Sequence, residues 1–148
     1  MGTMSNGPLP TTLTFLSSLP TSPTGSKVRF LGCVTHYTLS NATLSLQHSY
    51  PASQAGTVVA LVDASLLLEG LKRENTQVGA WVNIIGYVEG VYGKREEVKK
   101  KSKSGGEGIA TGSDMEPVKV RIKAVVMWSA GSLKLGAYEA ALEERLRL

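Results

Sequence analysis

The sequence predicts an all-β fold with helices, built on a small barrel of five strands. Two long strand-forming segments, Lys27–Leu39 and Ala80–Gly93, each carry a glycine near the middle, as strands that bend around a small barrel do. A third segment after Pro117 alternates apolar and basic residues with a period of two. At 148 residues the chain is long enough for one domain with a substantial core.

The first strand, Lys27–Leu39, is expected to bend at Gly32 and to place apolar residues on both faces. One face would hold Val28, Phe30 and Val34, and the other Leu31, Cys33 and Tyr37. Ser40-Asn41 is typical of a tight turn, and the second strand, Ala42–His48, would point Leu44 and Leu46 inward.

The third strand is predicted at Thr57–Val62 and is followed by a helix. Asp63 is a suitable N-cap for a helix over Ala64–Glu74, whose apolar face would consist of Leu66, Leu67 and Leu71.

The fourth strand, Ala80–Gly93, is apolar on both faces and therefore needs cover on both. Its core face would hold Val82, Ile84, Gly86 and Val88. Its outer face would hold Trp81, Ile85, Tyr87 and Val91. These side chains would have to be buried by the terminal helix or by another subunit.

The fifth strand begins at Pro117, with an inward row of Val118, Val120, Ile122, Ala124 and Val126. A helix starting at Gly131-Ser132 ends the sequence. Three strands, a helix, two strands and a terminal helix describe a five-stranded Greek-key barrel of the oligonucleotide/oligosaccharide-binding (OB) type. We expect a flexible arm with a short docking segment at 1–26 and the barrel at 27–131, interrupted by a disordered basic insertion at about 94–116. A partner-binding helix would occupy 132–148.

Excess positive charge is concentrated in the predicted loop between the fourth and fifth strands. Lys94–Lys103 has a net charge of +4, equal to the net charge of the whole chain. Since this loop flanks the ligand face of OB barrels, its cations are candidates for nucleic-acid phosphates: Lys94, Arg95, Lys99, Lys100, Lys101 and Lys103. Tyr37 and Tyr92 are candidates for base stacking. The alternative is a solvated insertion that only keeps the protein soluble.

Residues for catalysis or metal binding are scarce. His36 and His48 are the only histidines and fall on different strands, and Cys33 is the single cysteine. No nucleophile–base pair or set of metal ligands can be proposed, so we expect a non-enzyme without a cofactor. One cysteine also excludes an intrachain disulfide and favours a reducing compartment. No stretch is apolar enough to predict a membrane span.

The C-terminal helix carries one apolar stripe, formed by Leu135, Tyr138, Leu142 and Leu146, with Ala141 and Arg145 at its margin. A helix of this length is marginal alone in water and needs a surface to lie on. That surface is either its own barrel or a helix of a partner subunit.

The run Gly25–Val34, GSKVRFLGCV, followed by a two-strand meander and the Gly79–Gly86 strand, resembles the Ten-one family, the smallest subunit of the telomere-capping CST complex. The resemblance covers Leu13–Gly90 and, more loosely, Pro117–Leu148. It implies an OB-fold subunit that pairs with the Stn-one subunit and, with a larger subunit, binds single-stranded telomeric DNA. It further implies a nuclear, telomeric location, protection of chromosome ends and support of fill-in synthesis by DNA polymerase alpha–primase.

By position, the resemblance implies that Tyr138, Leu142 and Arg145 contact the partner, with Arg29 joining them. Leu135 and Leu146 complete the predicted partner surface through the stripe. Two alternative functions remain: a standalone single-stranded nucleic-acid-binding OB module, and the smallest subunit of replication protein A.

Overall fold

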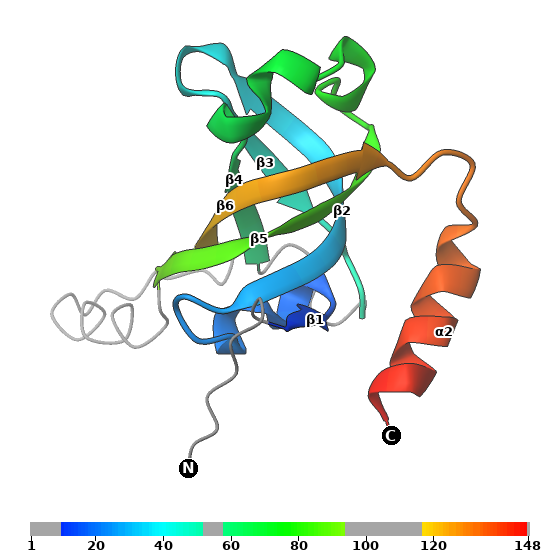
Figure 1. Cartoon of the computed structure of the whole chain (residues 1–148). Helices are drawn as coiled ribbons and strands as arrows, with labels where there is room; N and C mark the ends of the chain where they lie inside the picture. The colour runs from blue at the N-terminus through cyan, green and yellow to red at the C-terminus, as the bar shows by residue number, and fades with distance from the viewer. Residues whose placement is uncertain (1–9, 52–57, 94–116, 148) are drawn as a thin grey trace, which may run out of the picture.

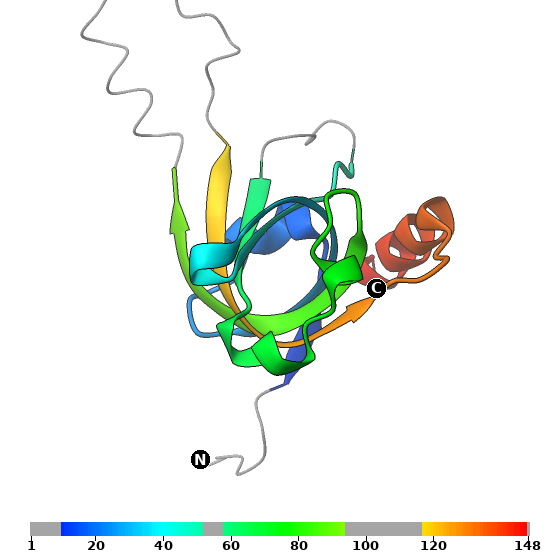
Figure 2. The ribbon, with the colours of Figure 1, turned by 90° about the horizontal axis from the view of Figure 1, so that it is seen from above.

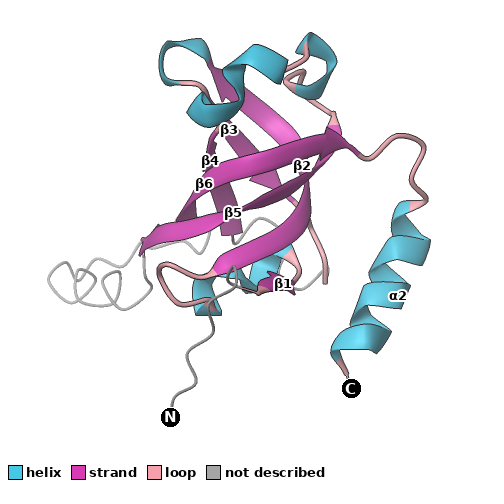
Figure 3. Ribbon diagram, in the orientation of Figure 1, coloured by secondary structure: helices cyan, strands magenta, loops and turns pink. Residues whose placement is uncertain are grey.

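The computed structural model describes residues 10–51, 58–93 and 117–147. Strands dominate this part of the chain, joined by short 3-10 turns and followed by an α-helix, α2, at Leu135–Leu146 (Figures 1 and 3). The strands in chain order are β1 Thr11–Leu13, β2 Lys27–Thr38, β3 Thr43–Gln47, β4 Val58–Asp63, β5 Trp81–Tyr92 and β6 Val118–Ser129.

Strands β2 to β6 close into a barrel. The sheet order is β1-β2-β3-β4-β6-β5, and an additional pairing of β2 with β5 completes the ring (Figure 2). Strand β4 runs parallel to β6, and the other pairs within the ring are antiparallel. The predicted five-stranded OB barrel is therefore confirmed, with β1 added outside the ring in parallel to β2.

The core follows the alternation of the strands and includes part of the segment before β2. The predicted inward residues of β2, β3 and β5 are almost fully buried: Val28, Phe30, Val34, Leu44, Leu46, Val82, Ile84 and Val88. The 3-10 turn η1 (Leu16–Thr21) adds Leu16 and Leu19, which are also completely buried in this core. The turn η1 is thus part of the barrel's packing through Leu16 and Leu19.

Two β-bulges reverse the alternation that the sequence pattern predicts. In the β2–β3 pairing the register shifts between Val34 and His36, so that Tyr37 lies opposite Leu44 and packs against the core. In the β5–β6 pairing it shifts next to Gly86. Val126, expected inside, is consequently 44% exposed, and Met127 packs against the core in its place.

The predicted helix at Ala64–Glu74 is not α-helical. Two 3-10 turns occupy the connection, η4 at Ser65–Gly70 and η5 at Arg73–Asn75, separated by extended backbone. Leu67 and Leu71 pack against the core as expected, but Leu66 is 61% exposed. Gly70 sits at the interruption, and its high cost inside a helix gives a physical reason for the break. Asp63 accepts a hydrogen bond from the Ser65 N–H at 2.9 Å, but the N-cap residue of η4 is Ala64, not Asp63 as predicted.

Gly86 is required where β5 crosses β6. A Cβ at this position would lie 2.4 Å from the backbone carbonyl oxygen of Lys123 and 2.8 Å from Ile122 Cγ2. The close approach of the β5 and β6 backbones therefore occurs at the bend predicted in β5. It lets β5 curve around the barrel.

Candidate partner-binding site

Helix α2 lies outside the barrel, and its axis runs steeply to the direction of β5 and β6 (Figure 1). Leu142 is 3% exposed, and Leu135 and Tyr138 are half-buried. Most of the predicted apolar stripe therefore contacts the helix's own barrel. Leu146, at the end of the stripe, is 49% exposed.

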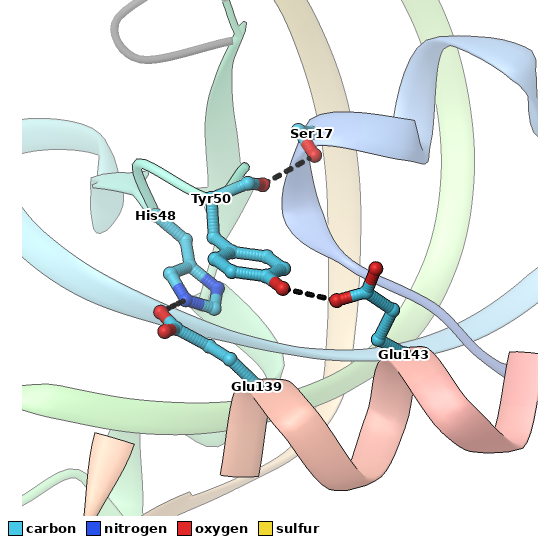
Figure 4. A network of polar contacts seen from close by, with 5 residues as sticks. All are labelled: Ser17, His48, Tyr50, Glu139 and Glu143. Atoms are coloured by element: carbon cyan, nitrogen blue, oxygen red, sulfur yellow. Dashed lines mark hydrogen bonds and ion pairs between the residues drawn. The ribbon is translucent and has the colours of Figure 1, made fainter. Parts of the chain in front are cut away.

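Two carboxylates on α2 bind side chains that follow β3 (Figure 4). His48 Nε2 lies 2.8 Å from Glu139 Oε2, in a contact where the histidine side chain is 1% exposed and the glutamate 16%. One helical turn further on, Glu143 accepts a hydrogen bond from the Tyr50 hydroxyl. The Tyr50 carbonyl in turn accepts the Ser17 hydroxyl at 2.8 Å, so these contacts connect η1, the end of β3 and α2.

Aromatic rings surround His48 and keep water away from its contact with Glu139. The edge of Trp81 lies at 5.4 Å between ring centroids, Phe15 at 5.9 Å, Tyr50 at 6.2 Å and Tyr138 at 6.5 Å. A hydrogen bond to a charged group is stronger in such surroundings than in water. The aromatic rings around His48 also shield Trp81 from solvent. Part of the outer face of β5 is therefore buried by other residues of the same chain.

Arg29 on β2 lies near the same helix. Its guanidinium sits 5.1 Å from the centroid of the Trp128 ring, a cation–π geometry, and its Nε is buried without a hydrogen-bond partner in the described residues. Burial raises the pKa of Tyr138, and the positive charge of Arg29 acts in the opposite direction. The structure thus brings together Arg29 and Tyr138, two residues that sequence reasoning assigned to one surface.

The side of α2 that faces away from the barrel is exposed. We call this surface the outer face of α2; its residues are Gly136, Ala137, Ala140, Ala141, Glu144 and Arg145. Short side chains on a helix allow a second helix to approach at the lower end of the usual 8–10 Å interaxial distance.

The predicted partner-binding residues divide into two groups in the structure. Arg145, on the outer face, and Leu146, at the exposed end of the stripe, are accessible, whereas Leu142 is buried against the barrel and Leu135 and Tyr138 are half-buried. Sequence reasoning missed the carboxylates that hold the helix. Their four-residue spacing, Glu139 and Glu143, was a usable signal, since residues at i and i+4 lie on the same side of a helix.

The predicted nucleic-acid-binding residues have different outcomes. The six cations from Lys94 to Lys103 lie outside the described residues. Tyr37 stays a prediction: after the bulge at Thr35 it lies opposite Leu44, half-buried and packed against the core. Tyr92, at the end of β5, is 50% exposed.

Two features are absent from the described residues. None of their helices is long and apolar enough to cross a membrane. In the same ranges, no group of three or more His, Cys, Asp or Glu side chains could hold a metal ion.

The closed barrel and the terminal helix docked on its outer wall place this chain among the small OB-fold proteins. Within that class, a family model for Ten1, described as "Telomere capping, CST complex subunit", matches residues 1–143. The chain therefore belongs to the Ten1 family of telomere-capping CST complex subunits, which confirms the resemblance inferred from the sequence. No curated protein matches the sequence closely enough to count as a relative.

Solved structures with the same fold include two that contain Ten1. The S. pombe Stn1–Ten1 complex has a chain with a TM-score of 0.63 and 20% identity, covering 95% of this chain and 96% of that one. The S. pombe telomere capping protein Ten1 has a TM-score of 0.62 and 20% identity, covering 94% and 100%. U. maydis replication protein A bound to single-stranded DNA has a TM-score of 0.52 and 17% identity, covering 93% and 90%. These likenesses establish the OB fold.

Removing the carboxylate that contacts His48 tests how α2 is held. Glu139→Ala leaves a buried imidazole nitrogen without its partner, and we expect a loss of about 1–3 kcal/mol in the free energy of unfolding. Urea denaturation followed by circular dichroism measures this. Glu144→Ala, on the exposed side of the same helix, removes the same charge and should stay within about 0.5 kcal/mol of the unmodified chain. Equal effects of the two substitutions would show that the His48 contact does not stabilise the fold.

The Tyr50–Glu143 contact predicts an alkaline transition. The hydrogen bond to Glu143 raises the pKa of Tyr50 above its ordinary value of 10.0. Because the folded pKa is raised, the contact stabilises the protein fully below pH 10.0 and is lost as the pH rises through the folded pKa. Tyrosine ¹³Cζ NMR should show Tyr50 titrating above 10.0 in the unmodified chain and nearer to 10.0 in Glu143→Ala, with Glu144→Ala unchanged. Titration of Tyr50 at its ordinary value in the unmodified chain would contradict the contact.

Proposed function

We propose that this chain is the non-catalytic OB subunit that pairs with an Stn1-like OB subunit through the outer face of α2. Family membership supports a role in telomere capping. The S. pombe neighbour is a complex of Stn1 with Ten1, which supports a heterodimer as the working form. The observation that carries the proposal is that α2 is fixed to the barrel by one side and exposed along the other.

Docking prepares the helix for a partner. An isolated helix of 12 residues is marginal in water and would lose conformational entropy on binding. Here the contacts of Leu142 and Glu139 with the barrel have already ordered it. A partner therefore meets a preformed helix, which lowers the entropic cost of association.

The outer face suits a helix of the partner. Its central positions are occupied by Ala137, Ala140 and Ala141, which permit close packing. Leu146, at the end of the barrel-facing stripe, adds an exposed apolar side chain in the last turn. Arg145 and Glu144 offer charges at the rim, where they favour register and partner choice more than affinity. Within this proposal Arg29, Leu135, Tyr138 and Leu142 position the helix, while Arg145 and Leu146 contact the partner directly.

The wider role follows from the family. We place the heterodimer in the nucleus at telomeres, where with a larger CST subunit it would bind single-stranded DNA and protect chromosome ends. Support of fill-in synthesis by DNA polymerase alpha–primase belongs to the same proposal. The described residues supply a scaffold and binding surfaces for such a role, consistent with a subunit that works through its partners.

Co-purification tests the pairing. Ala141→Arg places a long charged side chain in the middle of the outer face, and we expect it to reduce recovery of a co-expressed Stn1-like subunit at least tenfold. The expected loss reflects a clash at a helix–helix contact. Because Ala141 is exposed, the chain's own unfolding midpoint should change little.

The matched control places the same arginine elsewhere. Leu39→Arg changes a residue that is 78% exposed in η2 (Leu39–Asn41), on the opposite side of the barrel from α2 (Figure 2), and should leave pairing intact. Leu142→Asp is unsuitable by itself, since it also removes a buried contact with the barrel. Full recovery of the partner with Ala141→Arg would refute the interface. Pairing with the replication protein A subunits instead would favour that alternative.

A further inference from the structure

An exposed aromatic ring and two cations lie together on the outer surface of the barrel, where β5 ends and β6 begins. The residues of this surface are Gly90 and Tyr92 on β5 and Lys119 and Arg121 on β6, and we call it the β5–β6 face. It lies at the far side of the barrel from α2 (Figures 1 and 2). It is therefore separate from the proposed partner surface.

Strand register places these side chains on one face. Tyr92 lies opposite Lys119 and Gly90 opposite Arg121. Val120, between the two cations, is completely buried, so its neighbours at positions one before and one after point outward. Lys119 and Arg121 are two residues apart on an extended strand, about 6.8 Å, a separation that successive phosphates of an unstacked strand can span.

Gly90 lets the Tyr92 ring lie back along the sheet. A Cβ at Gly90 would be 2.8 Å from the Tyr92 hydroxyl oxygen and 3.2 Å from ring carbon Cζ. The ring therefore covers the glycine with one side, and the residue is still 50% exposed. A flat aromatic ring supported from below and open above is the geometry on which a nucleic-acid base stacks.

The two cations are available for a ligand. Both are exposed, and neither forms an ion pair with a residue in 10–51, 58–93 or 117–147. The next cation along β6, Lys123, differs because its Nζ lies 3.3 Å from Asp63 Oδ2. Glu89, exposed beside the bulge in β5, is the acidic neighbour and limits the net charge of this surface.

We infer that the β5–β6 face binds single-stranded nucleic acid, with a base stacked on Tyr92 and adjacent phosphates bound by Lys119 and Arg121. A single strand is favoured because it alone presents both an unpaired base for the ring and a flexible backbone for closely spaced cations. The inference deepens the proposed function, on which it rests for the class of ligand. It assigns this chain a direct strand contact within the complex.

The test uses the full chain, alone and paired with an Stn1-like subunit, and a fluorescein-labelled 12-nucleotide oligodeoxythymidine at several salt concentrations. Tyr92→Ala should weaken binding at least about fivefold while the salt dependence keeps its slope, since stacking releases no counterions. Tyr92→Phe should keep most of the affinity. Gly90→Ala should act like Tyr92→Ala without changing any charge, because its Cβ displaces the ring; the backbone there is outside the left-handed region and accepts alanine.

The phosphate contacts have their own signature. Lys119→Ala with Arg121→Ala should reduce the slope of log affinity against log salt by about 1.4, at about 0.7 for each phosphate lost on a single strand. The matched control, Lys72→Ala with Arg73→Ala, removes two exposed cations from the connection between β4 and β5 and should leave the slope within error.

Several results would overturn the inference. One is the absence of oligonucleotide binding by both the chain and the pair at 50 mM salt, and another is an affinity that Tyr92→Ala leaves unchanged. A third is an equal slope of log affinity against log salt for the Lys119/Arg121 and Lys72/Arg73 double variants. The fourth is equal affinity for a duplex and for the single strand. Loss of all binding in a chain with serine at Lys99, Lys100 and Lys101, while the face variants bind normally, would also reject it. If the chain pairs with the Stn1-like subunit but the variants of the β5–β6 face bind the oligonucleotide normally, only this inference is refuted. If the chain does not pair with that subunit but the same variants lose affinity as expected, the proposed function is refuted instead.

Discussion

The buried contact between His48 and Glu139 is the constraint on which the exposed surface of this protein depends. His48 ends up inside a ring of aromatic side chains, where an unpaired imidazole would cost free energy. Glu139 contacts its Nε2 from α2, while Nδ1 has no hydrogen-bond partner in the described residues. Glu143 adds a second connection one turn later through Tyr50. These contacts fix both the position and the rotation of the helix. They therefore decide that Leu142 faces the barrel and that Ala137, Ala140 and Ala141 face away from it.

Bulges in the barrel strands determine the other surfaces. Each extra residue moves all later side chains of its strand to the opposite face until pairing ends. One bulge in β2 packs Tyr37 against the core and leaves it half-buried. A second irregularity in β5, between Val88 and Gly90, leaves Tyr92 facing out, opposite Lys119. The helix and the β5–β6 face then occupy separate sides of the barrel, so the two proposed binding surfaces do not overlap.

The sequence predicted the barrel well because its signals are local and regular. The alternation in Val118–Ala124 and the paired runs around Gly32 and Gly86 follow from burial of one strand face, and both appear in the structure.

Bulges and tertiary contacts were not predictable in this way. Tyr37 and Val126 were placed on the wrong face because a pattern of period two cannot register an extra residue. The helix at Ala64–Glu74 gave way to two 3-10 turns because Gly70 interrupts it, a cost that the apolar pattern of Leu67 and Leu71 does not reveal. The role of His48 depends on Glu139, which is 91 residues away in the chain, and no local pattern connects them.

The central claim is that α2 is docked on the barrel before a partner binds and that its outer face then forms the interface. Amide hydrogen exchange of the chain, free and in a 1:1 complex with an Stn1-like subunit, tests both parts. The account predicts that the amides of Leu135–Leu146 are already protected in the free chain, less so in Glu139→Ala, and gain further protection in the complex while β3 does not. Exchange of free α2 at the rate of an unstructured peptide would contradict the docking. Unchanged protection of α2 on complex formation would contradict the interface.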